Sequence, residues 1–163
     1  MAATLDATDW RILKELSQNG RITNVQLAQR VGITAPPCLR RVRVLEAAGL
    51  IRGYHAELDQ AELGYELTIL VMVSLHTQSE VDLHAFENAV LGWPLVRECY
   101  MLSGETDYYL KCIAPTMTMF QDFLINQLSA APNVASVKTA VTIKRTKHEP
   151  GVPFEHRPST VGT

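Results

Sequence analysis

Residues 21–51 read RITNVQLAQRVGITAPPCLRRVRVLEAAGLI, and this stretch decides the fold of the first part of the chain. Apolar residues recur at helical spacing on both sides of Gly32, which predicts two short helices joined by a tight turn. Thr23 followed by Gln26 forms a capping box that begins the first helix. The second helix carries three arginines around an apolar stripe, namely Arg40, Arg41 and Arg43 around Leu39, Val42 and Leu45. A short cationic helix braced by another helix suits insertion into the major groove of DNA.

The flanking residues complete a small domain. Asp6 is a suitable N-cap for a preceding helix that runs through Ile12 and ends at Asn19-Gly20. Pro36 and Pro37 fit the first turn of the arginine-rich helix, because the N–H groups there have no partner inside the helix. Residues 50–58 read as a small hairpin or wing. We therefore expect a winged helix-turn-helix domain over residues 1–58.

The pattern changes after a short polar hinge at residues 59–65. Strands are expected at residues 66–76, 95–102, 108–114 and 135–145, and helices at residues 80–91 and 116–130. The order βαββαβ is the ferredoxin-like arrangement and spans residues 66–147. The fold class is therefore α+β, with an N-terminal winged helix-turn-helix followed by a ferredoxin-like βαββαβ domain. Residues 148–163 contain three prolines and no periodicity, which predicts a flexible tail.

A βαββαβ unit places both helices on one face of its sheet. The other face, with Leu70 and Met72, is then left uncovered. An apolar sheet face in water favours association, and two copies that pair face to face would bury it symmetrically. We expect a homodimer that assembles further.

Charge is distributed unevenly along the chain, although the formal net charge is only −2. Residues 20–55 hold six arginines against one acid, Glu46, a balance of +5. Residues 61–163 hold seven basic and eleven acidic residues, a balance of −4. This asymmetry predicts that the first third of the chain faces a polyanion.

The three cysteines, Cys38, Cys99 and Cys112, are widely spaced and form no Cys-x-x-Cys pair. This usage predicts reduced thiols in a cytoplasmic protein, with no metal or other cofactor. A redox switch at Cys38, in the arginine-rich helix, stays open as an alternative. The N-terminus lacks a basic region followed by an apolar core, so no signal peptide is expected, and no apolar run is long enough to cross a bilayer.

Three sequence patterns, which follow one another in the expected order, carry a resemblance to a known family. They are Leu5-Asp6-x-x-Asp9-x-x-Ile12-Leu13 with Gly20-Arg21, then Arg41-Val42-x-x-Leu45-Glu46-x-x-Gly49-x-Ile51-x-Gly53-Tyr54, and Ser103-Gly104-x-x-Asp107-Tyr108-Tyr109-Leu110. Over residues 4–147 the chain resembles the Lrp/AsnC family of transcription regulators. The resemblance implies a sequence-specific DNA-binding regulator whose assembly or DNA affinity responds to a small molecule, usually an amino acid.

Candidate contacts to double-stranded DNA lie on the arginine-rich helix, on the preceding helix and on the wing. Arginine can bind guanine bidentately, and apolar surfaces can meet a thymine methyl group. Residues at the N-terminus of the preceding helix are expected to contact phosphates. Arg41 has an alternative role, in which it pairs with Glu46 or another acid and braces the fold. The predicted set is Asn24, Gln26, Thr34, Ala35, Pro37, Cys38, Arg40, Arg41, Arg43, Arg52 and His55.

The turn at residues 103–107 is the candidate effector site. An amino acid needs an acid or carbonyl groups for its ammonium, and N–H or hydroxyl donors for its carboxylate. The resemblance places this turn at a subunit interface where small molecules bind. The predicted set is Tyr100, Ser103, Gly104, Glu105, Thr106, Asp107 and Thr139. The alternative is a plain turn in which Gly104 and Asp107 serve the backbone geometry alone.

Other classes of function fit less well. The five histidines show no metal spacing, and no serine or cysteine lies in a nucleophile motif, so an enzyme is not expected. An RNA-binding sheet would carry basic and aromatic residues, whereas this domain is acidic. A ligand-sensing or protein-interaction module whose helix-turn-helix only dimerises stays open as the alternative to direct DNA readout.

Overall fold

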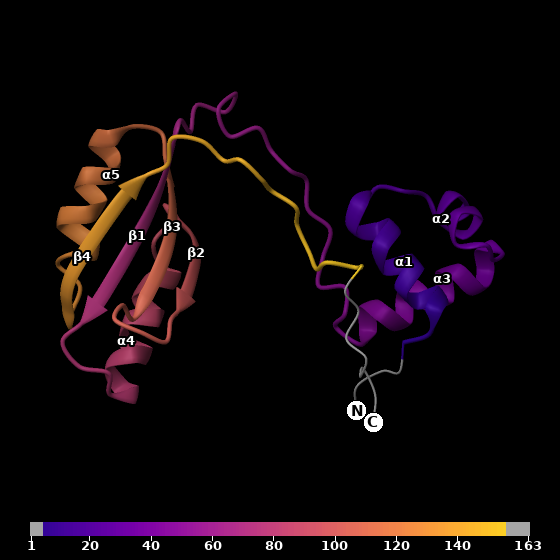
Figure 1. Ribbon diagram of the computed structural model, residues 1–163, viewed down its shortest axis with the longest axis horizontal. Coiled ribbons are helices and arrows are strands. Elements are labelled where there is room, and N and C mark those ends of the chain that lie inside the picture. The colour runs from indigo at the N-terminus through magenta and orange to yellow at the C-terminus, as the bar shows by residue number, and fades with distance from the viewer. Residues whose placement is uncertain (1–4, 156–163) are drawn as a thin grey trace. The chain divides into compact units, whose positions relative to one another are not determined.

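A computed structural model describes residues 5–155 of the chain and divides into two compact units. The first unit holds the residues up to Glu57 together with the segment that starts at Lys147, and the second holds Leu58–Thr146 (Figure 1). The chain therefore leaves the first unit, builds the second and returns to the first.

The first unit contains three helices, α1 (Ala7–Gln18), α2 (Asn24–Val31) and α3 (Ala35–Ala47). Asp6 and Asp9 form a capping box at the start of α1, and Thr23 and Gln26 form another at the start of α2. Gly32 ends α2 with a φ of +76°, a conformation that glycine adopts without steric cost. The resulting sharp turn separates α2 from α3, which begins three residues later at Ala35.

A small apolar core joins these helices. It consists of Ile12, Leu27, Ala28, Val31, Cys38, Val42 and Leu45. Helix α3 contributes Cys38, Val42 and Leu45, which recur at i, i+4 and i+7 on one face. The predicted apolar stripe was wrong at Leu39, which lies off that face and is 39% exposed.

The predicted hairpin over residues 50–58 was also wrong, because the described part of the first unit contains no strand. The segment after α3 is held by side-chain contacts instead of a backbone ladder. The Tyr54 hydroxyl donates to Glu46 Oε1 at 2.9 Å. The Tyr54 ring lies against Gly20, where an added Cβ would meet it at 3.2 Å.

The segment from Lys147 packs on the first unit, whereas a flexible tail was predicted. The Phe154 ring meets the Trp10 ring edge-on, with centroids 6.3 Å apart. Glu155 Oε1 lies 3.4 Å from Lys14 Nζ. These aromatic and ionic contacts hold the segment on α1, and residues 156–163 lie outside the described part of the chain.

The second unit is a four-stranded antiparallel sheet with two helical segments. In chain order it contains β1 (Leu67–Leu75), α4 (Glu80–Leu91), β2 (Val96–Met101), β3 (Tyr108–Ala114), α5 (Met117–Phe123), the π-helical turn η1 (Leu124–Leu128) and β4 (Val134–Val141). The strand order is β2-β3-β1-β4, and every pairing is antiparallel. This is the predicted βαββαβ arrangement, with the last predicted helix split between α5 and η1.

One face of the sheet carries the core of the second unit. Ile69, Val71 and Val73 of β1 alternate inward and pack in one cluster with Phe86 of α4 and Phe120 of α5. Both helices therefore cover the same face. The other face carries half-buried apolar side chains: Leu70, Met72, Tyr109 and Ile113.

Candidate functional site

Helix α3 has an outward face opposite its buried stripe. Pro36, Arg40, Arg43 and Ala47 share this face and are exposed. Within residues 5–155, Arg40 and Arg43 make no hydrogen bond or ion pair. Two exposed guanidinium groups without an acidic partner create a positive surface suited to phosphate oxygens and to guanine.

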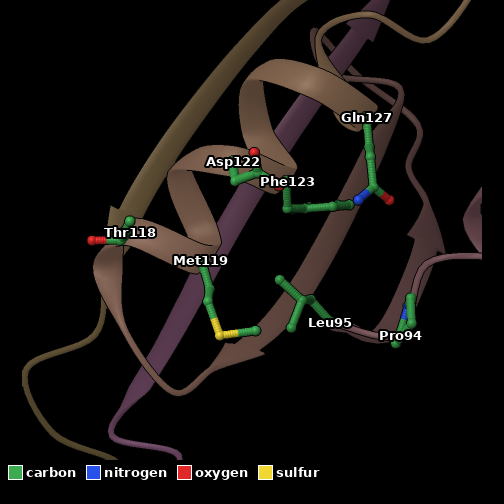
Figure 2. A pocket seen from close by; sticks show the side chains of 7 residues that line it. All are labelled: Pro94, Leu95, Thr118, Met119, Asp122, Phe123 and Gln127. Carbon is green, nitrogen blue, oxygen red and sulfur yellow. The ribbon is translucent and has the colours of Figure 1, made fainter.

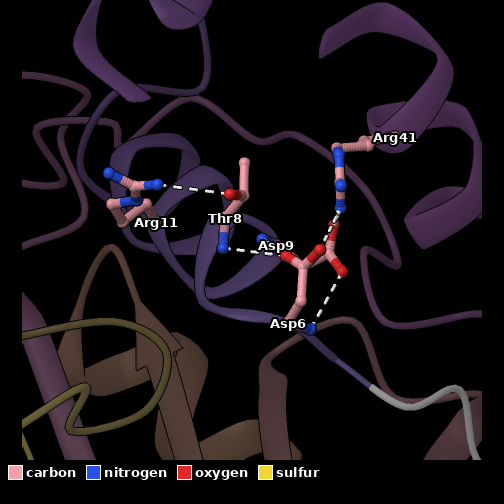
Figure 3. A network of polar contacts seen from close by, with 5 residues as sticks. All are labelled: Asp6, Thr8, Asp9, Arg11 and Arg41. Atoms are coloured by element: carbon pink, nitrogen blue, oxygen red, sulfur yellow. Dashed lines mark hydrogen bonds and ion pairs between the residues drawn. The ribbon is translucent and has the colours of Figure 1, made fainter. Parts of the chain in front are cut away.

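Arg41 lies off this exposed face and pairs with two acids at the start of α1, which is the bracing role given above as its alternative. Its Nη1 donates to Asp6 Oδ2 at 2.7 Å and to Asp9 Oδ1 at 2.8 Å (Figure 3). The backbone N–H of Asp9, together with the Arg41 guanidinium, lowers the pKa of Asp6. Arg41 therefore links α3 to the start of α1 through Nη1, and its contact to a base or phosphate stays a prediction.

Cys38 was wrong as a DNA contact, because its side chain has 0% exposure in the core. Burial raises the pKa of the Cys38 thiol. A protonated, buried thiol is a poor nucleophile, so the structure disfavours the redox switch as well.

Asn24 is occupied inside the helix-turn-helix. Its Nδ2 donates to the carbonyl oxygen of Ala35 at 2.8 Å, which ties the start of α2 to the start of α3. One of the two Nδ2 hydrogens and the Ala35 carbonyl are therefore in use, and the phosphate contact through Asn24 stays a prediction. Gln26 is exposed, but its Oε1 accepts from the backbone N–H of Thr23 at 3.2 Å and completes the capping box.

Thr34 precedes α3 as its N-cap, yet its hydroxyl makes no capping bond. An N-cap side chain accepts from the N–H of the second or third helical residue, and these are Pro36 and Pro37, which have no N–H. The exposed hydroxyl is therefore left for another partner. Pro37 is half-buried, and Arg52 and His55 are exposed on the segment after α3.

The turn between β2 and β3 presents a second set of candidates. The backbone N–H of Leu102 donates to the Asp107 carbonyl at 2.8 Å and closes the turn. Ser103, Gly104 and Glu105 are exposed, and Thr106 is half-buried. Gly104 has a φ of +149° with open space around it, so backbone conformation and not close approach requires glycine there.

Asp107 is turned inward and is 9% exposed. Its carboxylate accepts from the backbone N–H of Leu75 at 2.7 Å and from Gln78 Nε2 at 2.6 Å. These bonds join the turn to the end of β1 and to the loop after it, which is a structural role for Asp107, and a contact from Asp107 to an ammonium group stays a prediction. Gln78 was missed, because nothing in its own sequence neighbourhood marks it.

Tyr100 and Thr139 do not complete one pocket. Tyr100 lies on β2 and Thr139 on β4, which are opposite edges of the sheet. Tyr100 pairs with Tyr109 on the open face, whereas Thr139 pairs with Val71 in the row of the helix-covered face. The predicted grouping of these two residues was therefore wrong.

An open hollow of about 450 Å³ lies elsewhere in the second unit, beside α5 (Figure 2). Leu95, Met119 and Phe123 contribute to its apolar lining, and its polar lining residues are Thr118, Asp122 and Gln127. It contains no residue of the turn at 103–107. In the described residues no group of three His, Cys, Asp or Glu side chains could hold a metal ion.

Comparison with known proteins assigns both units. The winged helix-turn-helix DNA-binding family matches residues 5–52, and the Lrp/AsnC ligand binding domain matches residues 68–152. The leucine-responsive regulatory protein of Rhizobium meliloti (strain 1021) is 55% identical over 143 residues, which cover 88% of this chain and 92% of that protein. The chain belongs to the Lrp/AsnC family. The resemblance expected from the sequence is thus confirmed.

Solved structures agree with this Lrp/AsnC assignment. A transcriptional regulator from Neisseria meningitidis, in complex with L-Met, is 37% identical, with a TM-score of 0.89 over 94% of this chain and 99% of that chain. An AsnC family transcriptional regulator from Agrobacterium tumefaciens is 28% identical, with a TM-score of 0.87 over 93% of this chain and 98% of that one.

The Lrp/AsnC protein described here is a DNA-binding transcriptional regulator with a ligand-binding domain. Its fold class, a helix-turn-helix followed by a four-stranded antiparallel sheet with helices, is confirmed. Its relatives are transcriptional regulators, which are not enzymes. Among residues 5–155, no helix is long and apolar enough to cross a membrane.

Proposed function

We propose that this Lrp/AsnC regulator reads double-stranded DNA with the outward face of α3. The observation that carries the proposal is the pair Arg40 and Arg43, exposed and without an acidic partner in the described residues, opposite the buried stripe of the same helix. Thr34 adds a hydroxyl that its own helix does not use. Gln26, Pro37, Arg52 and His55 remain as flanking contacts to DNA.

Because Pro36 and Pro37 have no N–H groups, binding of DNA phosphates depends more on the side chains of Thr34, Arg40 and Arg43. A helix N-terminus usually attracts phosphate through its first free N–H groups. In α3 two of these donors are absent, so affinity for the backbone rests on guanidinium and hydroxyl groups. We expect binding to weaken steeply as salt rises, through counterion release.

The effector in this proposal is an apolar L-amino acid that binds at the turn of residues 103–106. Glu105 supplies the acid for its ammonium, because Asp107 is occupied, and Ser103 and Thr106 supply hydroxyl donors for its carboxylate. Support comes from the L-Met complex of the Neisseria protein and from the leucine-responsive name of the Rhizobium relative. L-Leu and L-Met are therefore the first ligands to test.

Assembly uses the open face of the sheet in this proposal. Leu70, Met72, Tyr109 and Ile113 are half-buried there with no helix over them, and pairing of two copies would remove this apolar surface from water. A dimer carries two copies of α3, so the operator should be an inverted repeat with both half-sites on one side of the duplex. The protein would act in the cytoplasm and have no catalytic role.

The direct test is a binding titration on the DNA upstream of the protein's own gene, with and without L-Leu, L-Met and a panel of other amino acids. The expected result is salt-sensitive binding to a discrete site, with an affinity or stoichiometry that changes for one apolar amino acid. Binding that is equal for all DNA sequences, with an intact amino acid response, would instead indicate a ligand-sensing module without direct readout.

A further inference from the structure

We propose that Leu39 recognises the 5-methyl group of a thymine in the operator. This inference rests on the proposed function, in which α3 enters the major groove. It assigns the apolar part of base recognition to a residue that the helical pattern alone placed in the core.

The position of Leu39 on α3 supports this role. Its neighbour Cys38 has 0% exposure, whereas Leu39 is 39% exposed. Residues three and four apart are adjacent on a helix surface, so Leu39 lies beside both Pro36 and Arg43. A leucine next to a guanidinium group that has no partner in the described residues complements a DNA groove, which offers phosphate charge and apolar methyl groups together.

The chemistry of the groove narrows the choice of ligand. The thymine methyl group is the apolar feature of the base-pair edges in the major groove. Replacing thymine by deoxyuridine removes that methyl group and leaves every hydrogen-bonding group of the base in place. The loss of one buried methyl-sized contact corresponds to about a fourfold loss of affinity.

Helix α3 also provides a matched control. Val44 is apolar and 57% exposed, but it lies more than one helical turn further from the N-terminal end. Recognition helices contact bases mainly with their N-terminal residues. Val44→Ala should therefore leave thymine recognition unchanged, although it removes a similar amount of exposed apolar surface from the same helix.

The experiment begins with the full chain and a preferred site selected from random duplexes. Each thymine of the site is then replaced by deoxyuridine, and Kd is measured for the wild type, Leu39→Ala and Val44→Ala. We expect one thymine per half-site at which deoxyuridine weakens the wild type about fourfold. At that position Leu39→Ala should bind both duplexes equally, and Val44→Ala should keep the wild-type ratio.

The outcomes separate the two proposals. Selection of no preferred site would overturn the proposed function and this inference with it. A preferred site at which no thymine is sensitive to loss of its methyl group overturns the role of Leu39 alone, and so does a Leu39→Ala protein that keeps the wild-type ratio. If Leu39→Ala does not fold, Leu39→Gln decides instead, because a polar side chain of similar length should bring the ratio at the sensitive thymine to about one, and a ratio equal to that of the wild type would overturn the proposal.

Discussion

Helix α3 and the turn between β2 and β3 each contain a charged residue that the sequence marks as functional and the structure turns inward. In α3 it is Arg41, which bonds Asp6 and Asp9. In the turn it is Asp107, which accepts from Leu75 and Gln78. In both regions exposed residues lie close to the inward one, namely Arg40 and Arg43 in α3, and Ser103 and Glu105 in the turn. The comparison teaches that one inward residue holds the backbone of each region in place, and the proposed function assigns the ligand contacts to the exposed residues nearby.

The two inward residues differ in their surroundings. The carboxylate partners of Arg41 are partly open to solvent, with 52% of the Asp6 side chain and 15% of the Asp9 side chain exposed. Asp107 is nearly buried, and its carboxylate joins the turn to the last residue of β1 and to the loop that follows it, through the Leu75 N–H and the Gln78 amide. Water therefore screens the first site more than the second, and substitutions should cost more at Asp107.

The largest expected effect is that of Asp107→Ala on the second unit. It leaves the Leu75 N–H and the Gln78 amide without their acceptor, and loss of two hydrogen bonds to a charged group should cost about 3 kcal/mol of unfolding free energy. Urea unfolding followed by circular dichroism measures it, with Glu105→Ala as the exposed control. A stable Asp107→Ala protein that fails only to respond to an amino acid would show that Asp107 is a ligand contact after all.

Next in size is the contrast between Arg40 and Arg41. Arg40→Ala should weaken binding to the preferred site by about 1–3 kcal/mol and leave unfolding unchanged, because its side chain is exposed and unpaired. Arg41→Ala should lower stability by about 1 kcal/mol, since it breaks the link to the start of α1. Parallel DNA titrations and thermal melts of the two variants check this. Equal losses of DNA affinity and of stability in the two variants would mean that Arg40 and Arg41 do not differ in role.

A smaller effect is expected for Phe154→Ala. The edge-on contact with Trp10 should contribute about 1 kcal/mol, all of it to the first unit. Hydrogen exchange resolves the units: protection should fall in α1 and remain in β1. Val152→Ala, at an exposed residue of the same segment, is the control. Unchanged protection in α1 would mean that the segment does not hold the helix.

The smallest effect concerns acid. The pKa of Asp6 is lowered in the folded protein, so its charge stabilises the fold above the unfolded value of about 3.9, and this stability is lost as the pH falls through the folded pKa. Asp6→Asn keeps a capping side chain without the charge. Melts should show it about 0.5 kcal/mol less stable at pH 7, with the difference vanishing near pH 2. A constant difference across this range would point to geometry and not charge.

Local patterns predicted most of the fold. The capping residues Asp6 and Thr23 act within three positions, and the alternation from Ile69 to Val73 describes one strand and its one buried face. Such signals lie within a few residues of the structure that they specify, so they can be recognised in a single chain. The order of the elements then leads to the ferredoxin-like arrangement.

The sites were harder to predict, because distant contacts decide them. Cys38 and Leu39 are adjacent and both apolar, so either could belong to the buried face of α3. The two prolines before them leave few upstream helical positions from which to infer which of the two faces the core. The packing against α1 and α2 selects Cys38 for the core. Asp107 and Gln78 are 29 positions apart, and no spacing rule joins an amide in one loop to a carboxylate in another.

The placement of Phe154 and Glu155 has a consequence for biosynthesis and for engineering. During translation all four strands of the second unit are synthesised before Phe154 and Glu155, which contact α1 in the first unit. The first unit therefore reaches its full stability only after the second unit has been synthesised. A fluorescent label attached at Glu155, whose carboxylate lies 3.4 Å from Lys14 Nζ, would lie beside α1.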